Sequence, residues 1–192
     1  MDPFSKDIGL RPPQGKADMV LITHNHDDHN NAAALKEDPL LIDGPGEYEI
    51  KGIDITGIPA FHDKKNGAER GQVTLYKIEV EDISILHLAD FGQDKLTDEQ
   101  LEKIGDVDVL MIPVGGVYTI DSEEAVKIIN QIEPRIVVPM HYKIQGLTIK
   151  LDPIEKFLKS MGAGHKEPVE KLALKKKELG GEEMEIVVMK AM

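Results

Sequence analysis

Three histidines and two carboxylates lie in one short segment, directly after the apolar run 19–22. The segment reads Thr23-His24-Asn25-His26-Asp27-Asp28-His29. A buried strand that ends at Thr23 can direct His24 and His26 to one side, while Asp28 and His29 reach a second point nearby. Neutral imidazole and carboxylate suit Zn²⁺, Mn²⁺ or Fe²⁺ where thiolate is absent. A polar surface loop would explain one such histidine, but this spacing predicts about half of a two-metal centre.

Further motifs follow in a fixed order along nearly the whole chain. They are Gly44-Pro45-Gly46-Glu47-Tyr48, Phe61-His62, His87-Leu88-Ala89-Asp90, Ile112-Pro113-Val114-Gly115-Gly116 with Tyr118-Thr119, and Val138-Pro139-Met140-His141-Tyr142. Together with H-x-H-x-D-H, this order resembles the metallo-β-lactamase superfamily. Within that superfamily, the chain looks most like the metal-dependent hydrolases related to ascorbate phosphate lactonases.

The resemblance implies a complete set of metal ligands. His62 would join His24 and His26 on one metal, and His141 would join Asp28, His29 and Asp90 on the second. Asp90 would bridge the two ions, and Ala89 stands where the family commonly has glycine. Taken alone, each of the later residues would be an ordinary turn or surface residue. His87 and His165 are left outside the ligand set.

The fold that the resemblance implies is α/β, a metallo-β-lactamase-like αβ/βα four-layer sandwich in a single domain, 1–192. Asp2-Pro3-Phe4 looks like the end of a strand, so the N-terminal strand pair of the family is expected to be missing. We expect Asp2 to orient ligating histidines from outside the ligand set. An open sheet edge would need a loop or a second copy to cover it, which makes a homo-oligomer one expectation.

Apolar periodicity and turn residues predict the elements. Strands are expected at 19–22, 40–42, 73–80, 83–88, 107–114 and 135–140, with a hairpin over 47–60 about Lys51-Gly52. Helices are expected at 30–36, 97–104, 121–132 and 153–161, the second opened by a Thr97-to-Gln100 capping box. The tail alternates apolar and charged residues, which predicts a hairpin of 169–179 and 182–189 about Gly180-Gly181.

Composition narrows the class of protein. At 192 residues, with 41% hydrophobic and 30% charged residues, the chain is typical of a globular protein. A net charge of −12 argues against a nucleic-acid partner. No cysteine is present, which removes disulfides and thiolate ligands. We found neither a membrane span nor a signal peptide, so no membrane partner is expected and the cytoplasm is the default location.

The leading hypothesis is a metal-dependent hydrolase with two divalent ions, Zn²⁺ first and Mn²⁺ or Fe²⁺ as alternatives. A metal-bridging hydroxide would attack a small ester, lactone or phosphodiester. Asp28 and Asp90 are the catalytic carboxylates, and the proton donor stays open. Tyr118 and Tyr142 are candidates to contact a substrate oxyanion, and Arg70 and Lys143 to hold an anionic substrate. The alternatives are a nuclease of the same fold and a metal-binding protein without turnover.

Overall fold

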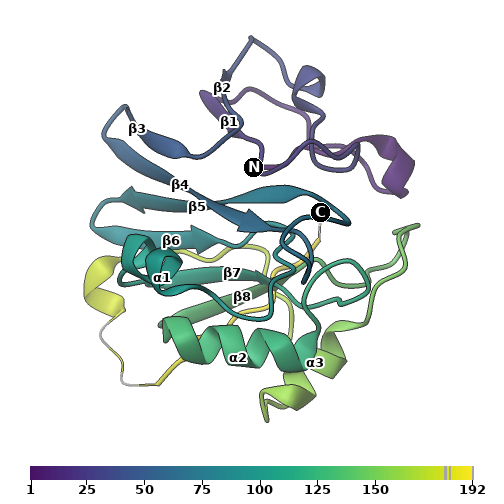
Figure 1. The fold of residues 1–192 in the computed structure, drawn as a ribbon, viewed down its shortest axis with the longest axis vertical. Helices are drawn as coiled ribbons and strands as arrows, with labels where there is room; N and C mark the ends of the chain where they lie inside the picture. Colours follow the sequence, from purple (N-terminus) through teal and green to yellow (C-terminus); the bar gives the residue numbers. More distant parts are fainter. Residues whose placement is uncertain (180, 182, 192) are drawn as a thin grey trace.

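The computed structural model describes residues 1–179, 181 and 183–191 (Figure 1). Its largest element is a seven-stranded sheet with the strands in chain order from β3 to β9. Pairing is antiparallel from β3 to β6 and parallel from β6 to β9. The strands are β3 (Gly46–Ile50), β4 (Ile53–Phe61), β5 (Gln72–Val80), β6 (Ile83–His87), β7 (Val109–Pro113), β8 (Ile136–Met140) and β9 (Glu185–Ile186). The predicted hairpin about Lys51-Gly52 is the β3–β4 pair.

Three helices cover one face of this sheet: α1 (Asp98–Ile104), α2 (Ser122–Ile132) and α3 (Ile154–Ser160). Figure 1 shows α2 lying along β8 with α3 beside it. Capping boxes begin α1 at Thr97, as predicted, and α2 at Asp121. Ala125, Ile128 and Ile129 recur at helical spacing on α2 and are fully buried in the largest apolar cluster, between helices and sheet.

The opposite face of the large sheet is shared by two segments. A second, two-stranded parallel sheet, β1 (Met19–Leu21) with β2 (Leu40–Ile42), packs through Leu21 and Ile42 onto Ile55 and Tyr76. The C-terminal tail packs onto β6, β7 and β8 beside it. The chain therefore has its metal-loop strand, β1, stacked on the sheet that carries the other predicted ligands.

The prediction of an α-helix at 30–36 is wrong. The structure has only a 3₁₀ turn, η2 (Ala32–Ala34), and a similar turn, η1 (Lys6–Ile8), near the start of the chain. Asn31 does not cap a helix with its side chain, because that amide donates to the carbonyl oxygen of Phe4. The segment therefore fastens the N-terminal residues instead of forming an α-helix.

The predicted tail hairpin is also wrong. β9 pairs in parallel with β8, and the stretch before it holds a 3₁₀ turn, η3 (Lys176–Glu178). Gly180 and Glu182 lie outside the described residues. Leu172, Leu174 and Leu179 pack on the face of β6 to β8. The alternation of apolar and charged residues in the tail thus arises from burial of the apolar side chains against the large sheet, and not from the pairing of two tail strands.

The N-terminal end of the chain is tied to β1 by a hydrogen bond from Asp2 N to Leu21 O (2.9 Å). On β2, Leu40 and Leu41 remain about half exposed. Within the described part of the chain, none of the helices has the length and apolar character needed to cross a bilayer.

Candidate metal centre

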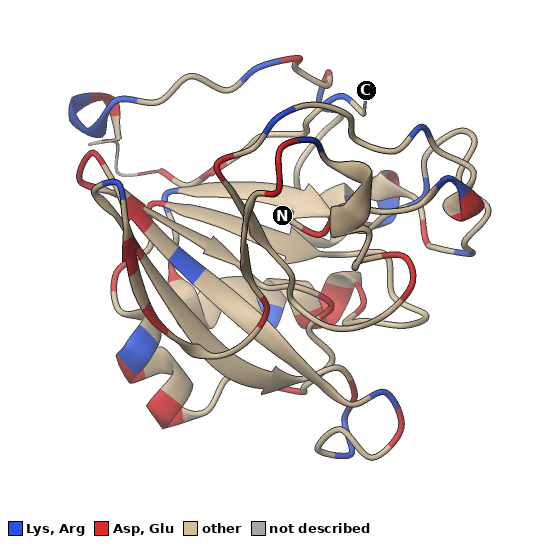
Figure 2. Ribbon diagram, turned by 90° about the horizontal axis from the view of Figure 1, so that it is seen from above, with Lys and Arg blue, Asp and Glu red and all other residues tan. Residues whose placement is uncertain are grey.

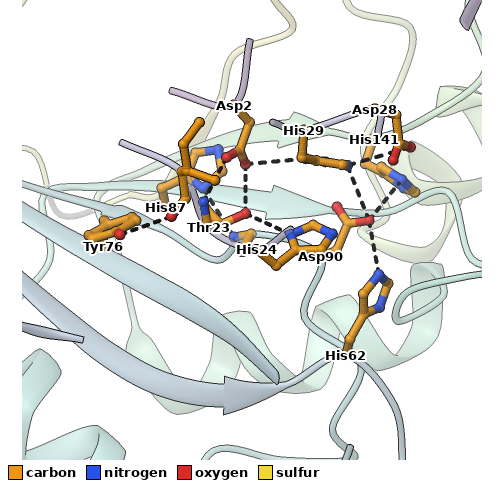
Figure 3. A network of polar contacts seen from close by, with 12 residues as sticks. Asp2, Thr23, His24, Asp28, His29, His62, Tyr76, His87, Asp90 and His141 are labelled. Carbon is orange, nitrogen blue, oxygen red and sulfur yellow. Dashed lines mark hydrogen bonds and ion pairs between the residues drawn. The ribbon is translucent and has the colours of Figure 1, made fainter. Parts of the chain in front are cut away.

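Four loops that each follow a strand of one of the two sheets meet at one place (Figure 3). The loop after β1 carries the histidine cluster, His62 directly follows β4, and His141 directly follows β8. Asp90 lies three residues after the end of β6. Residues far apart in the chain converge here because strand ends are where loops can present polar side chains.

Asp90 lies at the centre of this group. Its Oδ2 atom is 3.5 Å from Nε2 of His29, 3.4 Å from Nε2 of His62 and 3.4 Å from Nε2 of His141. Asp28 Oδ2 lies 3.7 Å from the same nitrogen of His29. One carboxylate oxygen therefore faces three imidazoles from three different loops.

Two overlapping sets of atoms are spaced to hold a cation. The ligand atoms of His24, His26 and His62 lie within 4.8 Å of one another, and so do those of His24, His29 and Asp90. The first set is the trio predicted for one ion. The second differs from the set predicted for the other ion, because it contains His24 in place of Asp28 and His141. Asp28 is nevertheless close to His29, and His141 is close to Asp90.

Unpaired buried nitrogens test whether the site suits a metal. Nε2 of His24, Nδ1 of His62 and Nδ1 of His141 are buried without a hydrogen-bond partner among the described residues. A buried polar atom without a partner costs about 1–3 kcal/mol. A cation that accepts the Nε2 lone pair of His24 removes that cost, and a site of imidazole and carboxylate fits a borderline transition ion.

Asp2 orients two of the histidines from outside the group. Its Oδ1 accepts from Thr23 N (2.8 Å), and its Oδ2 accepts from Thr23 Oγ1 (2.7 Å) and His29 Nδ1 (3.2 Å). Because the Thr23 hydroxyl donates its proton to Asp2, the same Thr23 oxygen accepts a hydrogen bond from Nδ1 of His24 (2.9 Å). Nε2 of both imidazoles then faces the site, the arrangement that carboxylates around metal-binding histidines provide.

At neutral pH three of these groups have the charge that a metal ligand needs, because His24 and His62 are neutral and Asp90 is ionised, whereas His29 is protonated and loses a proton when a cation binds its Nε2. Burial, together with neighbouring imidazoles, lowers the pKa of His24 to about 3, and burial also lowers the pKa of His62. Burial opposes ionisation of Asp90, but His141 and His29 outweigh it and hold its pKa below the usual range. Burial likewise disfavours charge on His29, but hydrogen bonds to Asp2 and Asp90 raise its pKa to about 10.

Close backbone contacts fix the later ligands. A Cβ atom on Gly92 would lie 2.3 Å from the carbonyl oxygen of His62, and one on Gly115 would lie 2.1 Å from that of His141. Ala89 and His141 themselves adopt positive φ angles of 51° and 52°. Such strain at non-glycine residues is held by the surrounding structure and concentrates at functional sites.

His87 is not among the converging residues. It is 7% exposed on β6, and its Nδ1 accepts a hydrogen bond from Ala89 N (3.0 Å). His165 is exposed and pairs with Glu167. Both histidines were left out of the predicted ligand set, and neither lines the pocket described next.

A pocket of about 340 Å³ opens over the converging residues. Arg70 and Tyr118, two of the predicted substrate contacts, line it. Tyr142 does not, because its hydroxyl donates to Met189 O (3.4 Å), and Lys143 is exposed away from the pocket. The sequence interpretation missed Glu69 and Ile149, which no motif marks. The lining is His26, Asp28, His62, Glu69, Arg70, Asp90, Tyr118, His141 and Ile149.

Comparison with known families settles the class. Residues 1–141 match the model of the β-lactamase superfamily domain. The chain belongs to the metallo-β-lactamase superfamily. Among curated proteins of this superfamily, UPF0173 metal-dependent hydrolases of Thermococcus onnurineus and Pyrococcus horikoshii are each 30% identical, with 84% of either chain covered. The chain is accordingly a metal-dependent hydrolase.

Solved structures agree with the superfamily assignment. A Thermotoga maritima protein described as a zinc-dependent hydrolase of the metallo-β-lactamase superfamily is 35% identical, with a TM-score of 0.77 over 98% of this chain and 87% of that chain. A metal-dependent hydrolase from Parabacteroides distasonis has a TM-score of 0.63 at 20% identity, over 98% and 82% of the two chains. The second likeness shows the fold alone.

Proposed function

We propose that this hydrolase binds two divalent ions through seven side chains. His24, His26 and His62 hold one ion, Asp28, His29 and His141 hold the other, and Asp90 bridges both. The observation that carries the proposal is the position of Asp90 Oδ2, which lies 3.4 to 3.5 Å from three imidazole nitrogens of three separate loops.

Zn²⁺ is the ion we expect, with Mn²⁺ or Fe²⁺ as alternatives. Five imidazoles and two carboxylates offer nitrogen and oxygen donors, and the chain has no cysteine to supply sulfur. Zn²⁺ and the neighbouring divalent ions accept this mixture, whereas Mg²⁺ and Ca²⁺ prefer oxygen alone. The Thermotoga maritima relative is described as zinc-dependent, which supports the same choice.

The proposed reaction is hydrolysis of a small ester, lactone or phosphodiester. When bound, the ions would lower the pKa of a water from ~15.7 toward ~7 and would polarise the oxygen of the scissile group. A new bond joins the water oxygen to carbon or phosphorus, the bond to the leaving oxygen breaks, and one water proton ends on that oxygen. Asp90 and Asp28 carry the negative charge of the site, and Asp28, with its side chain about a third exposed, faces the pocket.

The protein holds its own ligands ready for this reaction. Thr23 and Asp2 fix the rings of His24 and His29, so the ligand nitrogens need no rearrangement. The low pKa of His24 keeps its Nε2 lone pair available at neutral pH. Catalysis by bound ions depends on such fixed geometry.

Metal content and activity test the proposal together. Protein purified with Zn²⁺ or Mn²⁺ is expected to carry close to two ions per chain by elemental analysis and to hydrolyse members of a panel of lactones, esters and phosphodiesters. His26→Ala should lower the metal content and reduce hydrolysis by about 10³-fold or more. His165→Ala, which removes an exposed imidazole, is the matched control. Wild-type protein that binds neither ion would refute the proposal.

A nuclease of the same fold is the weaker candidate. Lys and Arg segments are interspersed with acidic ones (Figure 2), and the longest basic run, 175–177, is followed directly by Glu178, in a chain with a net charge of −12. A backbone-tracking groove needs clustered positive charge. Salt-sensitive binding to a labelled oligonucleotide would favour the nuclease over the small-molecule hydrolase.

The homo-oligomer and the cytoplasmic location stay predictions. The half-exposed Leu40 and Leu41 on β2 offer an apolar surface on which a second copy can pack. Analytical sedimentation of the wild type and of Leu40→Lys tests this surface, because the substitution should dissociate a dimer that forms through it.

A further inference from the structure

Apart from the histidines, the metal-facing pocket has one basic side chain among its described lining residues, and that side chain is Arg70. The lining residues outside the ligand group are Glu69, Arg70, Tyr118 and Ile149. A volume of about 340 Å³ is at the small end of ligand-binding cavities. A molecule whose scissile bond reaches the ligand group therefore extends to Arg70 within a few bonds.

The backbone of Arg70 is fixed by a buried carboxylate. Asp63, 4% exposed, accepts hydrogen bonds from the backbone N–H groups of Lys65 (2.7 Å), Gly67 (3.0 Å), Glu69 (3.0 Å) and Arg70 (2.7 Å). Asp63 directly follows the ligand His62. The loop between β4 and β5 thus holds a metal-facing histidine and Arg70 in one rigid turn.

The guanidinium group of Arg70 rests on an aromatic ring and stays available to a ligand. Its Cζ lies 5.5 Å from the centroid of the Tyr118 ring, within cation–π range. Lys64 and Lys65 of the same loop are engaged in ion pairs with Glu124 and Glu69. Arg70 has no ion pair among the residues that the structure describes, so its N–H donors have no carboxylate to neutralise them.

We propose that Arg70, positioned by the Tyr118 ring, binds a negatively charged group of the substrate separate from the bond that is cleaved. The proposal rests on the proposed hydrolytic function and narrows its substrate to small molecules that carry a carboxylate or a phosphate-like group. The planar guanidinium offers paired N–H donors that match either group with two parallel hydrogen bonds. Such binding sets which end of the molecule meets the catalytic centre.

A plain surface contact between Arg70 and Tyr118 predicts something different. If the pair only packs, removal of the guanidinium should change all substrates alike and by little, because exposed contacts contribute little. Recognition of an anion instead gives an effect that depends on the charge of the substrate. The difference between charged and neutral substrates is therefore the quantity to measure.

The experiment compares 4-nitrophenyl esters of one chain length whose far end is a carboxylate, a phosphonate, or the matching neutral group, a methyl carboxylate ester or a dimethyl phosphonate ester. We expect Arg70→Gln to lower the ratio of kcat/KM for the charged esters over the neutral esters by about 10-fold or more. The loss should appear mainly in KM. Arg70→Lys should restore part of the ratio, and Arg11→Gln, which removes an exposed guanidinium elsewhere, should leave it unchanged. The anion, carboxylate or phosphonate, whose ratio falls more in Arg70→Gln is the preferred one.

A binding measurement separates this proposal from the proposed hydrolysis. Calorimetric titration of Zn²⁺-loaded wild type with glutarate and with methylphosphonate should give a Kd about 10-fold tighter than that of Arg70→Gln for at least one of them. If no member of the panel of lactones, esters and phosphodiesters is hydrolysed but this difference is present, the proposed hydrolysis fails and the anion subsite stands. Equal affinity in both proteins, or an equal change of kcat/KM for charged and neutral esters, would overturn the subsite.

Discussion

The N-terminal region, residues 1–43, and the seven-stranded sheet both contribute residues to the candidate metal centre, but they are built differently. The N-terminal region has two three-residue strands and two 3₁₀ turns, and its buried apolar side chains come mainly from β1 and its neighbour Ile22. The sheet and its helices contain most of the buried core. The first region is therefore held by its contacts with the second far more than by its own interior.

The proposed ligands divide across this boundary. His24, His26, Asp28 and His29 belong to the N-terminal region, and the other three ligands follow strands of the large sheet. Direct contacts across it include Thr74 N to Thr23 O (2.8 Å) and the Tyr76 hydroxyl to Ile22 O (2.9 Å). Each proposed ion would be coordinated from both sides, so metal binding should stabilise the weaker region most.

The largest expected effect is on removal of metal. Treatment with a chelator should sharply lower hydrogen-exchange protection in residues 19–42, while the central strands β6, β7 and β8 keep theirs. An ion at about 1,000 times its Kd contributes roughly 4 kcal/mol to the folded state. Exchange measured by mass spectrometry on Zn²⁺-loaded and chelated protein checks this. An equal loss of protection in both regions would contradict the difference drawn between them.

Acid stability of the metal-free protein gives the next largest effect. Burial lowers the pKa of His87 to about 4, against about 6.5 when unfolded. Between pH 6.5 and 4, His87 is therefore protonated in the unfolded chain but neutral in the folded chain. The free energy of unfolding falls as the pH drops toward 4. The contribution of His87 is on the order of 3 kcal/mol. His87→Asn keeps an acceptor for Ala89 N without titrating, so its free energy of unfolding should fall less over this range.

Urea unfolding of chelated wild type and His87→Asn at several pH values measures this contribution. Because the pKa of His29 is raised to about 10, His29 is protonated in both states well below pH 6.5 and adds little slope there. His24, with a pKa of about 3, adds the same slope to both proteins. If the free energy of unfolding falls equally with pH in the two proteins, His87 is not the cause of the loss of stability in acid.

Asp2 should have a smaller effect, on metal affinity. Asp2→Asn removes the carboxylate oxygen that accepts from both Thr23 and His29, so it should weaken Zn²⁺ binding about 10- to 100-fold. Asp27→Asn removes an exposed charge in the same loop and is the matched control. Competition with a chromophoric chelator measures both affinities. A similar loss in the two variants would mean that net charge, and not the orientation of the histidines, accounts for the change.

The parts of the fold that local chemistry determines could be predicted from the sequence. The capping box at Thr97 and the β3–β4 hairpin depend on neighbouring residues, and both form as predicted. The helix at 30–36 and the tail hairpin failed because Asn31 and Leu172 are used in contacts with distant segments. A single sequence gives the period of a pattern and not the surface against which it packs.

The candidate site divides in the same way. The spacing of His24, His26 and His29 was enough to indicate a metal loop from the residues themselves. The later ligands were named only through family resemblance, because one histidine after a strand has no distinguishing pattern. Glu69 could not be named at all, since its place in the pocket follows from the turn that Asp63 organises. Long-range convergence is a property of the folded chain.

The smallest expected effect is at Ala89, where the large sheet leads into Asp90. Its φ of 51° lies in the left-handed region, which costs a residue with a Cβ atom more than it costs glycine. Ala89→Gly should therefore raise the free energy of unfolding by about 0.5–1 kcal/mol, with metal content unchanged. Ala125→Gly, in the middle of α2, should lower it by at least about 1 kcal/mol, because there glycine only adds freedom to the unfolded chain and loses core contacts. Denaturant unfolding of the two variants checks the opposite signs, and a destabilised Ala89→Gly would mean that the methyl packing outweighs the backbone strain.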